Sequence, residues 1–182
     1  MTRIYPQLTF TDSVKQAQEH YGTRATTRRM EAAAMADDRL GLREIDFIGK
    51  RDGFYVASVG DTGWPYVQFR GGPPGFLKVL DERTIAWADF RGNLQYVTTG
   101  NVAKDDRMAL ILMDYAGRKR LKIMARARIV DAADDPELIA RLADPDYNAE
   151  VERAVVLTIE AVDWNCPQHI TPRYTVEEFQ AL

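Results

Sequence analysis

The segment from 118 to 128 carries a strong chemical signal, because basic side chains recur there mostly at every second residue. Alternate residues of a β-strand lie on the same face, so the spacing predicts a strand with one basic and one apolar face. Like charges along one face repel each other and favour acidic neighbours or an anionic ligand. A strand that faces solvent explains the pattern equally well. The basic residues are Arg118, Arg120, Lys122, Arg126 and Arg128.

A second alternating segment places Tyr66, Gln68 and Arg70 on one face of a predicted strand. A ring, an amide and a guanidinium in a row can line a binding site. Arginine suits phosphate, because its planar guanidinium donates two charge-assisted hydrogen bonds. An ordinary exposed strand face remains the alternative interpretation.

The third candidate is the segment 89–93, where we expect a strand to pass into a short helix that starts at Asn93. Backbone N–H groups at a helix N-terminus attract anions, and Gly92 would let a phosphate approach the backbone closely. Asp89 is a poor neighbour for a dianion and is alternatively a helix cap. The segment by itself is weak evidence for a phosphate site.

The segment after the last predicted strand holds further candidates. Trp164 is either a wall for a planar ring or a core residue. His169 is either a proton donor or a structural residue, and Cys166 is reactive only if its pKa is lowered. None of the four segments is decisive alone.

Composition excludes several classes of protein. A chain of 182 residues with a net charge of −3 suggests one domain with no basic field for nucleic acid or a membrane surface. The longest apolar run, from Met108 to Met113, is far shorter than the ~18 residues of a membrane span. The N-terminus lacks a secretion-signal pattern. Two histidines and one cysteine make a poor zinc site. We therefore expect a cytoplasmic protein without a metal site.

The first fifty residues are expected to be helical. Thr11 is placed to cap a first helix and Thr27 a second. The apolar spacing over 42–48 predicts a third. We expect residues 1–50 to form an N-terminal extension that packs on a barrel domain of residues 51–182.

From Phe54 onward the hydrophobic period changes to two, which predicts strands. Six or so strands joined mainly by tight turns predict a mainly β protein, an antiparallel barrel with flanking helices. Few helices separate the strands, which argues against a parallel sheet. The expected strands are Phe54–Val59, Trp64–Arg70, Phe76–Leu80, Thr84–Asp89, Met108–Tyr115, Arg120–Val130 and Arg153–Val162, and a further helix is expected at Pro136–Ala143.

In this order the segments resemble the pyridoxamine 5′-phosphate oxidase-like family of FMN-binding split barrels. The resemblance covers about Leu42 to Arg173. The motifs that carry it are Gly63–Gly72 followed by Pro74-Gly75-Phe76, Trp87–Asn93, Gly100-Asn101, Arg118–Ile123 and Trp164–Pro167.

The resemblance implies a six-stranded antiparallel split β-barrel that forms a homodimer with FMN at the interface. It further implies an FMN-dependent oxidoreductase, with a small molecule or a reduced nicotinamide as its partner. The flavin would carry the redox chemistry, and no catalytic residue is assigned. The implied cofactor contacts are Gln68, Phe69, Arg70, Trp87, Ala88, Asp89, Asn93, Arg120, Trp164 and Arg173.

The sequence departs from the oxidase itself at two places. The oxidase has a lysine where Gly71-Gly72 stand here, and its C-terminal Arg-x-His-Asp-Arg signature is replaced over 167–173. FMN binding is therefore implied more strongly than oxidation of pyridoxamine phosphate. The alternatives are a flavin carrier or redox sensor without turnover, a barrel that binds F420 or haem, and a barrel whose charged strands face water. A haem would need His169 or Cys166 as its axial ligand.

Overall fold

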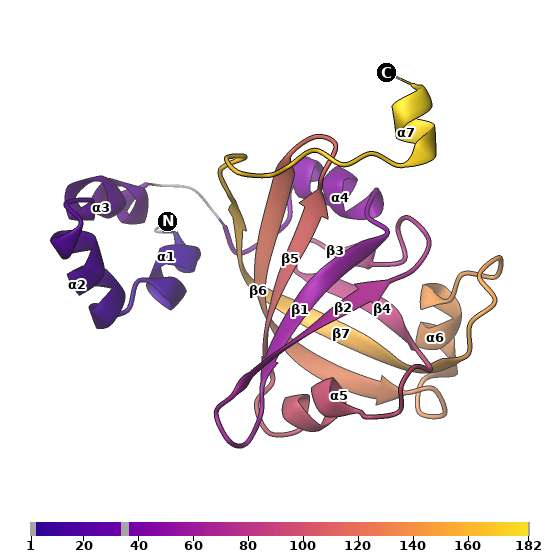
Figure 1. The fold of residues 1–182 in the computed structure, drawn as a ribbon. Helices are drawn as coiled ribbons and strands as arrows, with labels where there is room; N and C mark the ends of the chain where they lie inside the picture. The colour runs from indigo at the N-terminus through magenta and orange to yellow at the C-terminus, as the bar shows by residue number, and fades with distance from the viewer. Residues whose placement is uncertain (1–2, 34–36, 182) are drawn as a thin grey trace.

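The computed structural model describes residues 3–33 and 37–181, and its central feature is one antiparallel sheet (Figure 1). The strand order is β2-β1-β5-β6-β7-β4-β3. The mainly β, antiparallel fold is therefore confirmed. The sheet has seven strands rather than six, with β2 and β3 at its two edges. The strands are β1 (Gly53–Val59), β2 (Pro65–Gly71), β3 (Lys78–Asp81), β4 (Thr84–Phe90), β5 (Arg107–Asp114), β6 (Lys119–Asp131) and β7 (Val151–Trp164).

The helices agree only in part with the prediction. Thr11 caps α2 as expected. The prediction for Thr27 is wrong, because α3 already begins after Thr23. The helix expected from Asn93 begins only at Val97. None of the helices in residues 3–33 and 37–181 has the length and apolarity of a membrane span. The helices are α1 (Ile4–Thr9), α2 (Asp12–His20), α3 (Arg24–Ala32), α4 (Leu42–Gly49), α5 (Val97–Val102), α6 (Pro136–Leu142) and α7 (Val176–Gln180).

The main core lies on the inner face of the sheet, where the apolar residues of the alternating strands gather. Trp87 is 1% exposed, and its ring meets that of Phe54 edge to face at 5.1 Å. Leu121 and Leu157 reach the same core from β6 and β7. A smaller cluster that includes Ala88 lies on the other side of β4 and β7, beneath α6.

We expect Leu157→Ala to lower the free energy of unfolding by about 2–5 kcal/mol, because the side chain is fully buried in the core. Thr158, the next residue of β7, is exposed. Thr158→Ala is therefore a matched control, with an expected change within about 0.5 kcal/mol. Urea unfolding measures both, and equal losses would contradict this orientation of β7.

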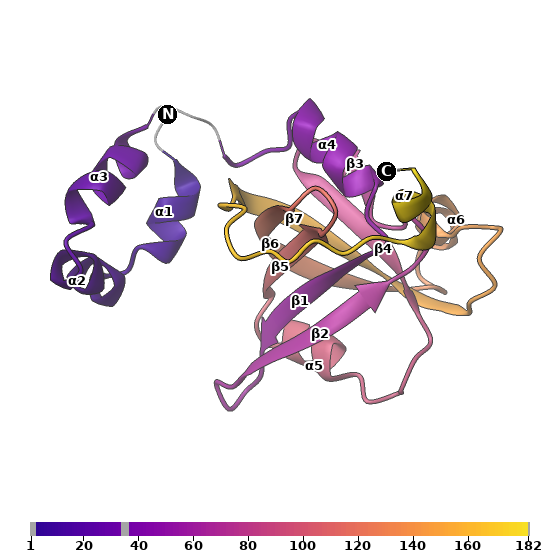
Figure 2. The ribbon, with the colours of Figure 1, turned by 45° about the horizontal axis from the view of Figure 1, so that its top comes forward.

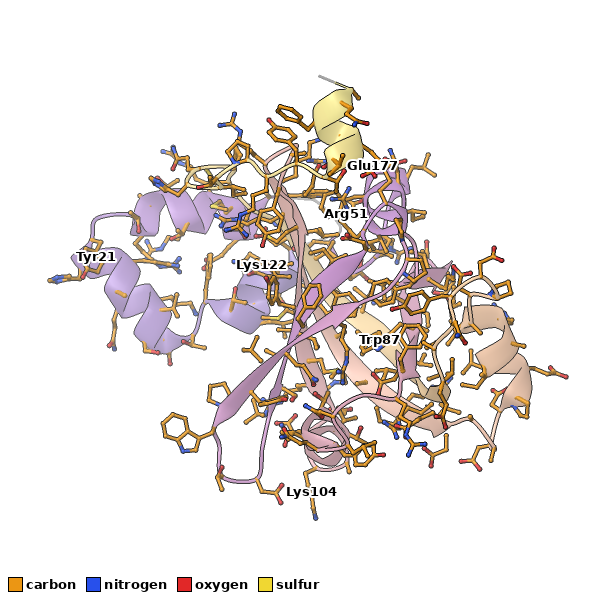
Figure 3. All side chains as sticks on the ribbon, turned by 45° about the vertical axis from the view of Figure 1, so that its right-hand side comes forward. Tyr21, Arg51, Trp87, Lys104, Lys122 and Glu177 are labelled. Carbon is orange, nitrogen blue, oxygen red and sulfur yellow. The ribbon has the colours of Figure 1, made fainter. Side chains whose placement is uncertain are left out.

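The opposite side of β1, β2, β5 and β6, here called the outer face, is largely apolar. Its register places Phe69, Tyr55, Ile111 and Lys122 in one row across the four strands. Two hollows of about 270 and 380 Å³ lie on this face, and side chains of α1 border both. Figure 3 shows Lys122 on the side toward the N-terminal helices, with Trp87 among the strands.

Helices α1, α2 and α3 stand to one side of the sheet (Figures 1 and 2). Neither α2 nor α3 buries a side chain. An ion cluster attaches α1 to the end of β7. The carboxylate of Asp37, which is 2% exposed, accepts hydrogen bonds from Arg3 Nε at 3.2 Å and from the backbone N–H groups of Ile4 and Tyr5 at 2.6 and 3.1 Å. Arg3 also donates to Asp163 at 2.8 Å.

Candidate functional site

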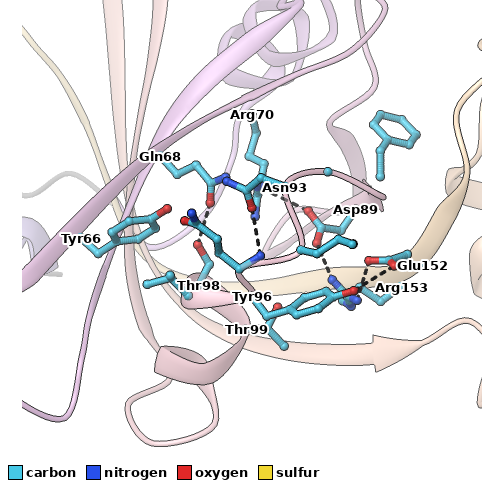
Figure 4. Close-up of a pocket in the computed structure, with 15 residues that line it drawn as sticks. Tyr66, Gln68, Arg70, Asp89, Asn93, Tyr96, Thr98, Thr99, Glu152 and Arg153 are labelled. Carbon is cyan, nitrogen blue, oxygen red and sulfur yellow. Dashed lines mark hydrogen bonds and ion pairs between the residues drawn. The ribbon is translucent and has the colours of Figure 1, made fainter.

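A small polar pocket lies between β2, the segment that leads into α5, and the beginning of β7 (Figure 4). Its volume of about 40 Å³ is room for roughly three water-sized groups. Amide, hydroxyl, guanidinium and carboxylate groups surround it, so a polar or charged ligand group fits better than an apolar one. Its polar side chains are those of Tyr66, Gln68, Arg70, Asp89, Gln95, Asn93, Tyr96, Thr98, Thr99, Glu152 and Arg153.

Strand alternation and register build two walls of this pocket. On the edge strand β2, Tyr66, Gln68 and Arg70 point inward, since their neighbours Val56 and Phe54 on β1 belong to the core. On the far wall, Asp89 of β4 stands directly opposite Arg153 of β7 in the ladder. Arg70 and Arg153, which are far apart in the sequence, thus both lie beside the carboxylate of Asp89.

Asp89 joins the two arginines. It is 5% exposed, and its oxygens lie 3.2 Å from Arg70 Nε and 3.2 Å from Arg153 Nη1. Arg153 also binds Glu152 at 2.8 Å, and its guanidinium lies 4.8 Å from the centre of the Tyr96 ring. Burial lowers the pKa of Arg153, but the neighbouring carboxylates of Asp89 and Glu152 outweigh burial and raise this pKa above its ordinary value. Arg153 is therefore a permanent cation.

Arg70 has an unused donor. Its Nε is buried and lies 3.2 Å from Asp89, but it makes no hydrogen bond to any residue in 3–33 and 37–181. An unpaired buried donor costs about 1–3 kcal/mol, and it commonly indicates a group that a ligand or water would satisfy. Nearby, the hydroxyl of Thr98 donates to Gln68 Oε1 at 3.1 Å, which fixes that amide in the pocket wall.

The segment between β4 and α5 forms the rim of the pocket in an uncommon backbone conformation. Leu94 and Tyr96 have φ angles of 60° and 52°, in the left-handed region. Asn93 Oδ1 accepts a hydrogen bond from the backbone N–H of Gln95 at 3.1 Å, so it stabilises a turn rather than a helix start. Such conformations gather at binding sites, where the surrounding structure holds them.

The structure brings four of the ten predicted cofactor contacts to this pocket, namely Gln68, Arg70, Asp89 and Asn93. Phe69 and Arg120 lie instead on the outer face. Phe69 packs against Tyr55 with ring centres 5.4 Å apart. Arg120 stands opposite Met113 in the ladder, and its buried Nε has no hydrogen-bond partner in the part of the chain that the structure describes.

The other four predicted contacts lie elsewhere. Trp87 is in the core, where its buried Nε1 has no hydrogen-bond partner among the described residues. Ala88 packs beneath α6. Trp164 packs edge-on against Phe47 of α4, with ring centres 4.9 Å apart. Arg173 lies 5.0 Å above the ring of a tyrosine that follows β5.

The basic strand predicted over 118–128 is real but less uniform than expected. Arg118 does not share its face, because the residue lies in the turn before β6 with a φ of 50°. Arg126 has acidic neighbours, with Asp106 at 2.7 Å and Glu160 at 3.1 Å. Acidic neighbours therefore neutralise the charge of Arg126. The buried Nε of Arg120, by contrast, has no hydrogen-bond partner among the described residues.

Sequence reasoning missed the contribution of β7, above all Arg153 and Glu152. The predicted strand Arg153–Val162 includes Arg153 but begins one residue after Glu152, whereas β7 begins at Val151. No local pattern shows that this strand pairs with β4. Tyr96 was missed for a similar reason, because its place at the rim depends on the turn after Asn93. His169 and Cys166 are both exposed in the tail. The described residues hold no group of His, Cys, Asp and Glu that could bind a metal ion.

Comparison with known proteins adds a family match and two similar folds. The family model described as pyridoxamine 5′-phosphate oxidase matches residues 45–166. No curated protein sequence matches. HupZ from Group A Streptococcus aligns with a TM-score of 0.56 at 12% identity, over 74% of this chain and 99% of HupZ. A proposed pyridoxamine 5′-phosphate oxidase from Lactobacillus delbrueckii aligns with a TM-score of 0.52 at 22% identity, over 69% of this chain and 94% of the Lactobacillus chain. At these identities the likeness concerns the fold alone.

Proposed function

This chain belongs to the pyridoxamine 5′-phosphate oxidase family, and we propose that it is a homodimeric flavoprotein that binds FMN with the phosphate end in the pocket around Arg70. The family match confirms the resemblance on which the sequence prediction relied. We propose further that the bound flavin serves an oxidoreductase reaction with a small molecule or a reduced nicotinamide.

The Nε of Arg70 is the observation that carries the proposal. This buried N–H is ion-paired with Asp89 at 3.2 Å but makes no hydrogen bond to any described residue, so it can still donate one to a phosphate oxygen. The side chains of Gln68, Asn93 and Thr98 add amide and hydroxyl groups that suit a ribityl chain. The residues therefore fit the phosphate end of FMN. A cavity of about 40 Å³ is too small for a three-ring flavin, so the ring would extend outside it.

The distribution of the remaining candidates supports a dimer. Arg70 of β2 is on the inner side of the sheet and Arg120 of β6 is on the outer face, with β1 and β5 between them, so a site that uses both would take them from two chains. A second copy would supply the missing outer face. That face has apolar hollows with Tyr55, Ile111 and Met124 in their walls, and exposed apolar surface of this kind is what protein interfaces bury.

FMN, when bound, supplies hydride and electron transfer at its ring. The chain would supply placement and charge. Arg70 and Arg153 would hold the phosphate, while Gln68 and Asn93 would orient the polyol. Arg120 of a second copy would place a positive charge near the ring, where negative charge develops on reduction.

Titration with FMN tests the proposal. We expect saturable binding, a shifted visible flavin spectrum, and release of unaltered FMN on denaturation. The proposal would be refuted if added protein left the flavin spectrum unchanged and FMN left the thermal stability of the protein unchanged. A sharp haem band or F420 fluorescence in the purified protein would favour those cofactors instead. For haem, the candidate axial ligands His169 and Cys166 lie in an exposed tail.

Arg70→Ala is expected to weaken FMN binding about 10- to 100-fold, because hydrogen bonds to charged groups contribute about 1.5–3 kcal/mol. Arg91 offers a matched control. It is half-exposed, pairs with Glu150 at 3.1 Å and does not line the pocket. Arg91→Ala should leave the dissociation constant unchanged. If the two variants bind FMN equally well, Arg70 does not hold the phosphate.

A further inference from the structure

The proposed phosphate pocket carries its own anions. Its charged lining consists of two arginines, Arg70 and Arg153, and two carboxylates, Asp89 and Glu152. Their formal charges sum to zero. A phosphate monoester carries about −1.5 to −2 at neutral pH, so FMN would bring its charge into a pocket whose cations are already paired.

Asp89 is the carboxylate that competes most directly with a ligand. It is buried and lies 3.2 Å from both arginines, whereas Glu152 contacts only Arg153 of the two. Its position follows from the strand ladder, in which Asp89 pairs with Arg153 across β4 and β7. Asp89 therefore remains between the arginines, and a phosphate has to share them with it.

We propose that Asp89 reduces the contribution of the ligand's phosphate charge, so that the site accepts flavins with an uncharged or singly charged tail nearly as well as FMN. Riboflavin represents the first class and a flavin phosphodiester the second. The inference rests on the proposed flavin function and adds the ligand selectivity of that site. It also gives Asp89 a role besides the cofactor contact that the family resemblance implies.

Measurement of two affinities tests this selectivity. In the unaltered protein we expect the dissociation constants for riboflavin and FMN to differ by less than about tenfold. Asp89→Asn keeps the shape of the side chain and removes its charge. We expect this substitution to lower the dissociation constant for FMN about tenfold and to leave that for riboflavin nearly unchanged. A hydrogen bond to a charged group accounts for a factor of this size.

Asp131 gives a matched control for the loss of one negative charge. It lies 3.9 Å from Arg153, but its side chain is 72% exposed and does not line the pocket. Asp131→Asn should leave the ratio of the two dissociation constants unchanged. If Asp89→Asn weakens both flavins equally, Asp89 is a ligand or a scaffold residue and the inference is wrong. A ratio above about 100 in the unaltered protein also overturns it.

Inorganic phosphate provides a test that needs no flavin. We expect millimolar phosphate to raise the melting temperature of Asp89→Asn more than that of the unaltered protein or of Asp131→Asn. The extra stabilisation should disappear in the double variant Arg70→Ala with Asp89→Asn. Equal phosphate effects in all variants would overturn the inference. Absence of flavin binding together with the expected phosphate effects would refute the flavin function and with it the flavin selectivity, while competition between Asp89 and phosphate for the two arginines would stand.

Discussion

A mixed dimer of one Arg70→Ala chain and one Arg120→Ala chain is expected to recover half of the FMN sites that each variant loses by itself. Arg70 is on the inner side of the sheet and Arg120 on the outer face. If each site takes Arg70 from one chain and Arg120 from the other, the mixed dimer has one site with both alterations and one site with neither. Co-expression of the two chains with different tags, followed by FMN titration, measures the recovery.

The reverse combination is the control. A dimer of one unaltered chain and one chain that carries both substitutions should have no intact FMN site, because each site then lacks one of the two arginines. If both arginines of a site come from the same chain, the two results exchange: the first dimer has no intact site and the second has one. That outcome would contradict an interface site while leaving FMN binding itself untouched.

Asp37→Ala is expected to release α1 from the sheet. The Asp37 carboxylate is buried, accepts from two backbone N–H groups and is paired with Arg3. Removal of one partner of a buried ion pair costs about 3–5 kcal/mol, because it leaves the other charge unpaired. Here the loss should fall on the attachment of α1, since Arg3 then keeps only Asp163.

Hydrogen exchange measures the release directly. The amides of Ile4 and Tyr5 should lose protection in Asp37→Ala, while those of the central strands β6 and β7 stay protected. Asp38 is the matched control, because it pairs with Arg39 and Arg83 at the surface. Exposed pairs contribute about 0–1 kcal/mol, so Asp38→Ala should leave α1 protected. Equal exchange in both variants would show that the ion cluster does not hold the helix.

Local patterns predicted most elements of the fold. The alternation around Leu121 predicts a buried and an exposed side for β6, and the structure has both. Thr11 caps α2, and the apolar spacing over 42–48 corresponds to α4. These predictions held because strand alternation and capping depend on neighbours a few residues apart. The cap predicted at Thr27 was wrong, because α3 already begins after Thr23. Predictions that depended on the path of a loop were wrong, as at Asn93, where two left-handed residues delay the helix.

For the candidate site, too, local patterns predicted some features and only the fold decided others. The sequence by itself determined the family and the row of Gln68 and Arg70 on one side of β2. Only the tertiary structure decided that Arg153 meets Asp89, because that contact depends on which distant strands pair. It also separated Arg70 from Arg120, since a strand pattern shows which residues share a face but not which way that face points. Register and the sidedness of the sheet are properties of the whole fold, and they decide which of the predicted residues can meet one ligand.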